Sequence, residues 1–584
     1  MLSAAPAIAD LPAGYWTVDR SQPLLDSMLT VRLEPDLSQL SAAETRSLDE
    51  LIEAGRILQD LYERQLHRQA AESHEALKAL HIATGRTQAT HNLLELYYAF
   101  KGPIATTLDN ERLPFLPVAD EDPGKTIYPA GLLRDEIERY LGTAPESKMD
   151  LLHERSVVRR STRENIDRDL ERLDAYPEIG ALHAGLRRKL EALEANAAAF
   201  YAVPYALVYA AELRKVRLHL LTAAELLEDE SPDFAAYLRN RGRDLLSGDY
   251  ESGDASWVSG QFGNLNAAIG SYETYDDNLL GAKAFYGVSL LIRDQARSRE
   301  LVSAVAGLQA IEDSLPYDHR RTVRAQIPIG VYNVVADFGQ SRSANTATIL
   351  PNDPDYARKY GRTILMRYNI LTNADIFANR KQRFDAVIVP EFSDHLTADG
   401  SFERTLWHEI GHYLGVSKTA RGQELSVALA DYSDLLEEMK SDLVSLFAAR
   451  ALRESGYHDD TSLRAHYADG IRRTLQVVRP RATQPYQNMQ LMQFNFYMEF
   501  GVIEASGDLG RLAINYDRYH DAVAELLREV LQLQYAADYA LAKAFVERWN
   551  YWEENLHGRL AQRMRDAVRY RTTVVHYAVL DNGA

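Results

Sequence analysis

The sequence predicts an α+β protein that is predominantly helical, and three observations support this fold class. The segment 41–66 has apolar residues at helical spacing, and Ser41 with Glu44 forms a capping box at its start. Residues 147–247 repeat that spacing with many Glu/Arg pairs. From about 324 to 393 the chain instead carries β-branched and aromatic runs. A chain of 584 residues exceeds one simple core, so we expect several domains or one large two-lobed body.

The remaining elements follow from turn residues and apolar runs. Segments 102–130 and 246–265 are rich in Gly, Pro, Asp and Ser and are expected to be loops. Three runs are predicted strands of a small sheet: "AQIPIGVYNVVADFG", "TILMRYNIL" and "FDAVIVPEF". After residue 402 a helical pattern extends to about 570, and the tail "RTTVVHYAVL" is a candidate to return to the sheet.

Composition excludes several classes of function. The formal charge is −19 and no dense Lys/Arg block exists, which argues against a nucleic-acid partner. The absence of cysteine excludes disulfides, a cysteine nucleophile and thiolate metal sites. No run of eighteen apolar residues is present, so no membrane span is expected. The start "MLSAAPAIADLPAG" is expected to be a disordered leader or the remnant of a trimmed signal peptide, and both cytoplasm and periplasm stay open.

The segment "FERTLWHEIGHYLGV", residues 402–416, contains an H-E-x-x-H motif. Residues four apart share one face of a helix, so His408 and His412 can point at one metal ion. Glu409 lies beside them, where it can polarise a water molecule. The alternative is an ordinary amphipathic helix with surface histidines.

A second acidic motif follows on another helical pattern, "DYSDLLEEMKSDLVSLF" at 431–447. The part "EEMKSD" resembles the N-E-x-x-S-D signature of thermolysin-like zinc peptidases, which identifies Glu438 as the third zinc ligand. By the same match Asp442 fixes a histidine ring and Glu437 supports the ligands. The alternative is a solvated charged helix face, but leucines surround these carboxylates and buried carboxylates need partners.

Together these motifs resemble the dipeptidyl peptidase III family of zinc exopeptidases. "SYETYDDNLLGAKAFYG" at 271–287 is similar to that family's E-(S/T)-Y motif followed by an aromatic-x-Gly segment. "TILPNDPD" at 348–355 is similar to its I-x-x-P-N-(D/Y) strand and turn. The resemblance spans most of the chain in the family's order, whereas its specific motifs cover about forty residues.

The resemblance implies two lobes around a wide cleft. One lobe with a small β core would comprise 1–293, 324–393 and 571–584, and a helical lobe of 294–323 and 394–570 would carry Zn²⁺. It also implies a set of roles: zinc ligands His408, His412 and Glu438; general base Glu409; Tyr275 as donor to the tetrahedral intermediate; Glu273 and Asn352 as holders of the substrate's amine. Separately, Arg571 would reach a substrate carboxylate if the tail crossed the cleft.

Three positions depart from the family pattern. Most members have one more residue between the histidines, whereas this chain has the five-residue spacing found in some bacterial members. Tyr286 replaces an acidic residue near the amine pocket, and Leu491 stands where the family has a histidine of the cleft.

These features lead to three functional hypotheses. The first is a zinc peptidase that cleaves near the N-terminus of oligopeptides; its alternatives are a zinc enzyme acting on a non-peptide or N-blocked substrate, and a non-catalytic binding protein with a vestigial site. A small peptide or small molecule is the expected partner, and the oligomeric state stays open.

Overall fold

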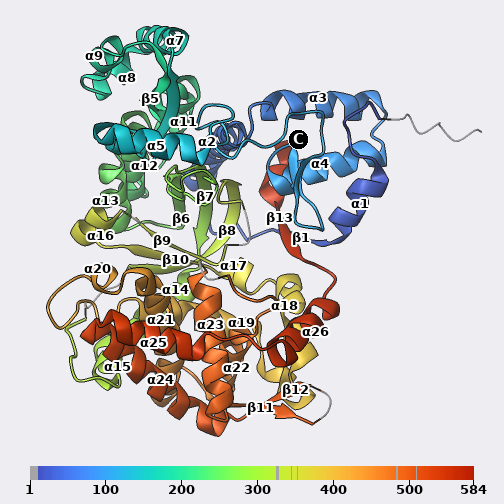
Figure 1. The fold of residues 1–584 in the computed structure, drawn as a ribbon, viewed down its shortest axis with the longest axis vertical. Coiled ribbons are helices and arrows are strands. Elements are labelled where there is room, and N and C mark those ends of the chain that lie inside the picture. Colours follow the sequence, from blue (N-terminus) through green and yellow to red (C-terminus); the bar gives the residue numbers. More distant parts are fainter. Residues whose placement is uncertain are drawn as a thin grey trace, which may run out of the picture.

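One five-stranded sheet lies between two helical regions in this computed structural model, which describes residues 11–323, 328–342, 345–351, 353–481, 484–507 and 510–583 (Figure 1). Its strand order is β6 (Leu265–Ser271), β7 (Tyr286–Arg293), β8 (Ile329–Gly339), β10 (Thr363–Arg367) and β9 (Ala347–Leu350). Strands β8 and β10 are parallel, and the other neighbours are antiparallel.

Helices make up most of the rest of the chain. Up to residue 260 they are α1 (Val18–Asp26), α2 (Ala42–Leu66), α3 (Ala70–Ala83), α4 (Gln88–Phe100), α5 (Arg134–Thr143), α6 (Lys148–Leu151), α7 (Arg163–Ala175), α8 (Pro177–Leu182), α9 (Leu186–Glu191), α10 (Tyr205–Val208), α11 (Ala210–Leu226), α12 (Pro232–Ser247) and α13 (Glu251–Ser259). Beyond it they are α14 (Gln295–Val305), α15 (Leu308–Ser314), α16 (Pro354–Tyr360), α17 (Tyr368–Leu371), α18 (Ala374–Val387), α19 (Ala398–Gly411), α20 (Leu425–Leu429), α21 (Ser433–Glu454), α22 (Asp460–Thr474), α23 (Pro485–Glu499), α24 (Tyr516–Ala536), α25 (Tyr539–Trp549) and α26 (Arg559–Ala567).

Four two-stranded pairs complete the described strands. They are β1 (Met28–Leu33) with β13 (Thr572–Tyr577), β2 (Ile104–Thr106) with β3 (Arg112–Pro114), β4 (Ser156–Ser161) with β5 (Asn196–Pro204), and β11 (Ile503–Ser506) with β12 (Arg511–Ile514). Within the described part of the chain, no helix combines the length and the apolar character that a membrane crossing requires.

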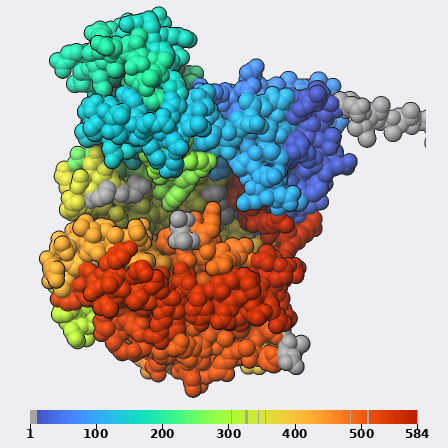
Figure 2. Space-filling model, in the orientation of Figure 1, coloured from blue at the N-terminus to red at the C-terminus, as the bar shows by residue number. Residues whose placement is uncertain are grey.

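The central sheet contributes to two separate hydrophobic cores because its side chains alternate between its faces. On β10, Leu365 packs into the core formed with α2, α11 and α12, whereas Ile364 and Met366 pack into the core formed with α19, α21 and α24. A third, smaller core lies between α1 and α4. Figure 2 shows the surface hollowed between the upper region, coloured blue to green, and the orange lower region. The predicted α+β class with two lobes is therefore confirmed.

Helix α2 begins at the predicted capping box. Ser41 Oγ accepts from the Glu44 amide at 3.1 Å, and Glu44 Oε2 accepts from the Ser41 amide at 3.0 Å. The helix lies close against the sheet at Gly55, where an added Cβ would fall 2.4 Å from the ring of Phe338. This contact fixes α2 across strands β7 and β8.

Several predicted elements were wrong. "FDAVIVPEF" is not a strand. Its first four residues end α18, which Asn373 caps and whose buried face includes Phe384 and Val387, and its last three begin a 3-10 helix, Pro390–His395. The tail forms β13, which pairs with β1 and not with the five-stranded sheet. Strands β4 and β5 interrupt the segment expected to be helical, and α13 occupies part of the expected loop 246–265. Short apolar runs do not distinguish a strand from a buried helix, which explains the first of these errors.

Candidate metal centre

Two packed helices, α19 and α21, carry the H-E-x-x-H and E-E-x-x-S-D motifs. The helices approach closely at Gly411, where an added Cβ would lie 2.6 Å from the Ser441 carbonyl oxygen. Because only glycine allows this backbone contact, Gly411 brings the histidines of α19 within reach of the carboxylates of α21.

His408, His412 and Glu438 form one compact group. The ligand atoms that the three residues offer all lie within 4.8 Å of one another. Glu438 Oε2 is 3.2 Å from His408 Nε2 and 3.7 Å from His412 Nε2. The two imidazole rings are nearly perpendicular, at 88°, with their centroids 5.0 Å apart. The three groups thus converge on one point from two helices.

Carboxylates behind the histidines orient both rings. Asp442 Oδ1 lies 2.6 Å from His408 Nδ1, and Asp442 also pairs with the buried Arg404. His412 Nδ1 lies 3.0 Å from Glu437 Oε1. Partners at Nδ1 leave each Nε2 directed at Glu438, which is the usual arrangement around a histidine-bound metal.

The buried charges of this group shift one another's protonation. Burial alone would raise the pKa of Asp442, but the charge of Arg404 and the contact with His408 hold it well below its usual range. Burial likewise opposes ionisation of Glu437, yet the charge of Lys440 and the contact with His412 lower its pKa to about 2. Burial alone would lower the pKa of His408, but the hydrogen bond and the charge of Asp442 have a larger effect and raise this pKa to about 9. The site therefore favours positive charge at its centre.

These residues fit a zinc ion. Ligand atoms about 2.0–2.1 Å from a tetrahedral zinc ion lie about 3.3 Å apart, close to the Nε2–Oε2 distances found here. Glu438 Oε2 is buried without a hydrogen-bond partner among the described residues. Two imidazoles, which bind a metal in their deprotonated form, and one carboxylate are a donor set that catalytic zinc sites use.

A cavity of about 830 Å³ opens in front of the group. The helical side supplies Glu409, Glu438 and Tyr486, and the opposite side supplies Glu273 and Tyr275 from the loop that follows β6. Edge strand β9 lines the same cavity. No residue that the structure describes forms a hydrogen bond with the Glu409 carboxylate, which leaves that group available to a ligand.

Two tyrosines lie near Glu438, Tyr275 on the opposite side of the cavity and Tyr486 on the same side. Tyr275 is 81% exposed, yet partial desolvation by the cavity walls and the charge of Glu273 raise its pKa, with a further effect from Glu438. Burial and the charge of Glu438 also raise the pKa of Tyr486. Both phenols therefore stay protonated at neutral pH and can donate hydrogen bonds.

Sequence reasoning missed Tyr486. It noted only that Leu491 stands where the family has a histidine of the cleft. Leu491 is buried and is not among the residues that line the cavity, whereas Tyr486, in the first turn of α23, lines it. Nothing in the sequence distinguishes this tyrosine from the other 32.

The remaining expected residues have different surroundings. Glu273 lines the metal-site cavity and also a neighbouring cavity of about 250 Å³ that contains Asp276. Arg571 lines neither cavity, and its guanidinium donates to the Leu108 carbonyl at 2.8 Å. Asn352 lies outside the described residues.

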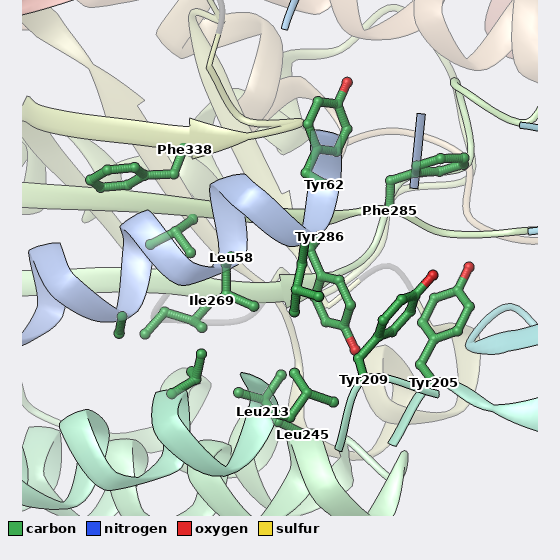
Figure 3. Close-up of a cluster of buried hydrophobic side chains, with 14 of the residues drawn as sticks. Leu58, Tyr62, Tyr205, Tyr209, Leu213, Leu245, Ile269, Phe285, Tyr286 and Phe338 are labelled. Atoms are coloured by element: carbon green, nitrogen blue, oxygen red, sulfur yellow. The ribbon is translucent and has the colours of Figure 1, made fainter. Parts of the chain in front are cut away.

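Tyr286 does not belong to an amine pocket. Its side chain is 1% exposed and packs between Tyr205 and Tyr209, with ring centroids 5.8 and 6.1 Å away (Figure 3). The expectation that this residue alters the substrate pocket was wrong, because at this point β7 directs the side chain into the core.

Comparisons with known proteins bear on the fold. None of the protein-family models matches this chain. A plant protein from Arabidopsis thaliana named Nudix hydrolase 3 is 24% identical over 556 residues, covering 89% of this chain and 69% of that protein. The solved structure of DPP III from Caldithrix abyssi superimposes with a TM-score of 0.79 at 23% identity, over 96% of this chain and 99% of that chain. Dipeptidyl peptidase III from Corallococcus sp. strain EGB gives a TM-score of 0.73 at 22% identity, over 97% and 98% of the two chains.

Both structural matches extend over nearly the whole chain. At this level of identity the likeness concerns the architecture. The expected likeness to dipeptidyl peptidase III is thereby confirmed for the fold.

Proposed function

We propose that this protein is a zinc-dependent hydrolase that cleaves amide bonds near the N-terminus of oligopeptides. One observation carries the proposal: the His-His-Glu group and the unpartnered carboxylate of Glu409 face the same 830 Å³ cavity. Names of similar proteins support it, since two of them are dipeptidyl peptidases and the plant relative is named a hydrolase.

His408, His412 and Glu438 would hold the zinc ion. When bound there, zinc supplies Lewis-acid chemistry that polarises a carbonyl and makes a water molecule more acidic. Asp442 and Glu437 keep the imidazole rings in the orientation that such binding requires.

Glu409 acts as the general base. Its carboxylate takes a proton from the attacking water and delivers it to the nitrogen of the leaving amine. Tyr275 donates a hydrogen bond to the oxygen that becomes negative in the transition state. Tyr486 lies near Glu438 in the same cavity and is a second candidate donor to that oxygen. A raised phenol pKa suits both tyrosines for donation.

Acidic groups on the sheet side would hold the substrate's free amine. Glu273 lies in the metal-site cavity, and Asp276 lies in the adjoining cavity with Glu273. Asn352 remains a proposed partner of the same amine. Because Tyr286 is a core residue, its replacement of an acidic residue no longer favours an N-blocked or non-peptide substrate.

Glu409→Gln tests the mechanism. We expect turnover of a dipeptidyl amide with a free amine to fall about 10²- to 10⁴-fold, because the variant loses its proton acceptor. Zinc content, measured by plasma mass spectrometry, should stay at one ion per chain, since Glu409 is not a ligand.

Glu424→Gln serves as the control. Glu424 is an exposed residue of the same lobe that pairs only with Lys418 at 3.6 Å, so activity should not change. Full turnover by zinc-loaded Glu409→Gln would contradict the mechanism. If the wild-type protein contained no stoichiometric zinc, the alternative of a binding protein with a vestigial site would be favoured instead. A preference for N-blocked amides over free-amine amides would exclude the proposed substrate.

A further inference from the structure

Four arginines line a second cavity, of about 340 Å³, beside α18 and α22. They are Arg380, Arg383, Arg472 and Arg473. Among the described residues, no Asp or Glu lines this arginine pocket, and none of its lining residues lines the metal-site cavity. The pocket is a local exception in a chain whose formal charge is −19.

The four side chains come from two helices. Arg380 and Arg383 are three residues apart on α18 and therefore share a face. Arg472 and Arg473 lie in the last turn of α22. Both helices belong to the lower lobe in Figure 1. The fold, rather than a run of basic residues, brings the four charges together.

One carboxylate pairs with two of these four positive charges. The buried Asp469 pairs with Arg472 at 2.6 Å and with Arg473 at 3.3 Å. No described residue forms a hydrogen bond or an ion pair with Arg380. Arg383 reaches only the Tyr570 carbonyl, at 3.5 Å, and its Nε atom is buried without a partner.

Such an arrangement is unfavourable without a counterion. Burial, together with the charge of Arg472, lowers the pKa of Arg380 to about 10, and burial with the same neighbour also lowers that of Arg383. Partly buried like charges destabilise one another unless an anion neutralises them. A volume of about 340 Å³ lies in the range of small-molecule sites, about 300–1,000 Å³.

We propose that the arginine pocket binds a small anion of the phosphate class, either free phosphate or a phosphomonoester. Two guanidinium groups without acidic partners match the charge of about −1.5 to −2 that a phosphate monoester carries at neutral pH. Their planar donors suit the tetrahedral oxygens of phosphate, which accept paired hydrogen bonds. This site is independent of the proposed peptidase reaction, because it uses none of the residues around zinc.

Calorimetric titration of the zinc-loaded full-length protein tests the proposal. Inorganic phosphate, glycerol 2-phosphate and succinate are titrated at constant ionic strength into wild type and into the double variant Arg380→Gln/Arg383→Gln. We expect wild type to bind at least one phosphate compound, and the double variant to bind it about tenfold more weakly or worse. Comparing the two phosphates decides between a free ion and an ester.

Arg188→Gln is the matched control, since Arg188 is an exposed arginine of α9 with no described ion pair. It should bind phosphate as wild type does. Without phosphate, the double variant should unfold at the same or a higher temperature than wild type, whereas purely structural arginines would give a lower one. If the double variant does not fold, the single variant Arg380→Gln replaces it in the same titrations.

Three results would overturn the assignment. The first is equal phosphate affinity in wild type and in the pocket variants, which would place the anion elsewhere, including at zinc. The second is absence of phosphate binding by wild type at millimolar concentration. The third is tighter binding of succinate than of either phosphate, which would make the site one for carboxylates.

Discussion

At the scale of single residues, the direction of a side chain decides whether it belongs to the site. Tyr286 and Tyr275 are eleven positions apart and near the same strands, yet one is 1% exposed and the other 81% exposed. Tyr286 contributes to the aromatic cluster shown in Figure 3, whereas Tyr275 faces the metal-site cavity. Substitutions at the two positions should therefore affect different measurable properties.

Tyr286→Glu should destabilise the fold without acting through the substrate pocket. A carboxylate placed among Tyr205, Tyr209 and the neighbouring leucines would be buried, and the nearby Arg155 already pairs with Glu154, so we expect a loss of about 3–5 kcal/mol in the free energy of unfolding. Denaturant titration measures it. Tyr286→Phe, which keeps the ring, should cost much less. A stable Tyr286→Glu variant with altered KM would show that the residue does face the substrate.

At the scale of elements, the contact between α19 and α21 builds the metal centre. Neither helix carries the whole group, since His408 lies on α19, His412 is the C-cap residue of α19, and Glu438 lies on α21. Lys440 adds a second connection, since its ammonium donates to the carbonyls of Gly411 and Leu414 at 2.9 Å. The separation of the two helices therefore controls the separation of the ligands.

Gly411→Ala should weaken metal binding. The added methyl group would overlap the backbone of Ser441, so the helices must move apart and carry Glu438 away from the histidines. We expect zinc affinity to fall about tenfold or more and the free energy of unfolding to fall by about 1–3 kcal/mol. Competition with a chromogenic chelator measures the affinity.

Gly142→Ala provides the comparison for that variant. Gly142 lies in α5 with no described atom within 4 Å of an added Cβ, so the substitution should leave zinc affinity unchanged and hold or raise stability. Equal zinc affinity in Gly411→Ala and wild type would show that α19 and α21 tolerate separation.

At the scale of the whole molecule, the two cores meet at the central sheet and carry buried groups that resist protonation. His458 packs against Tyr457 and His466 in the helical lobe, and its Nε2 atom is buried without a partner. Burial lowers the pKa of His458 to about 4 and that of His466 well below its ordinary value. His74, in the N-terminal region, has a pKa of about 4 for the same reason.

These histidines make the protein sensitive to acid. In the unfolded chain His458 takes up a proton near pH 6.5, but in the folded chain it does so only near pH 4. Between these values the unfolded state binds more protons, so the stability of the helical lobe falls as the pH falls. His458→Gln should reduce this dependence by about 1.4 kcal/mol per pH unit between pH 6.5 and 4, as measured by urea titration. An unchanged pH dependence would mean that His458 is protonated in the folded protein.

The sequence was informative wherever a local pattern carries the structure. The capping box at Ser41 predicted the start of α2, and the β-branched run before residue 339 predicted β8. It failed for "FDAVIVPEF", whose first residues end α18 because that helix packs against α26, and whose last residues begin η2 (Pro390–His395). A short apolar segment takes the conformation that its neighbours can pack against, and those neighbours are distant in sequence.

The sequence by itself determined which residues could form a metal group, because helical spacing places His408 beside His412 and the second motif supplies Glu438. Only the tertiary structure decided which side chains surround that group. It brought Tyr486 to the cavity, turned Tyr286 into the core and collected four arginines from two helices in one pocket. The physical reason is that spacing within one helix follows from its backbone geometry, whereas contacts between elements depend on how all the buried surfaces pack at once.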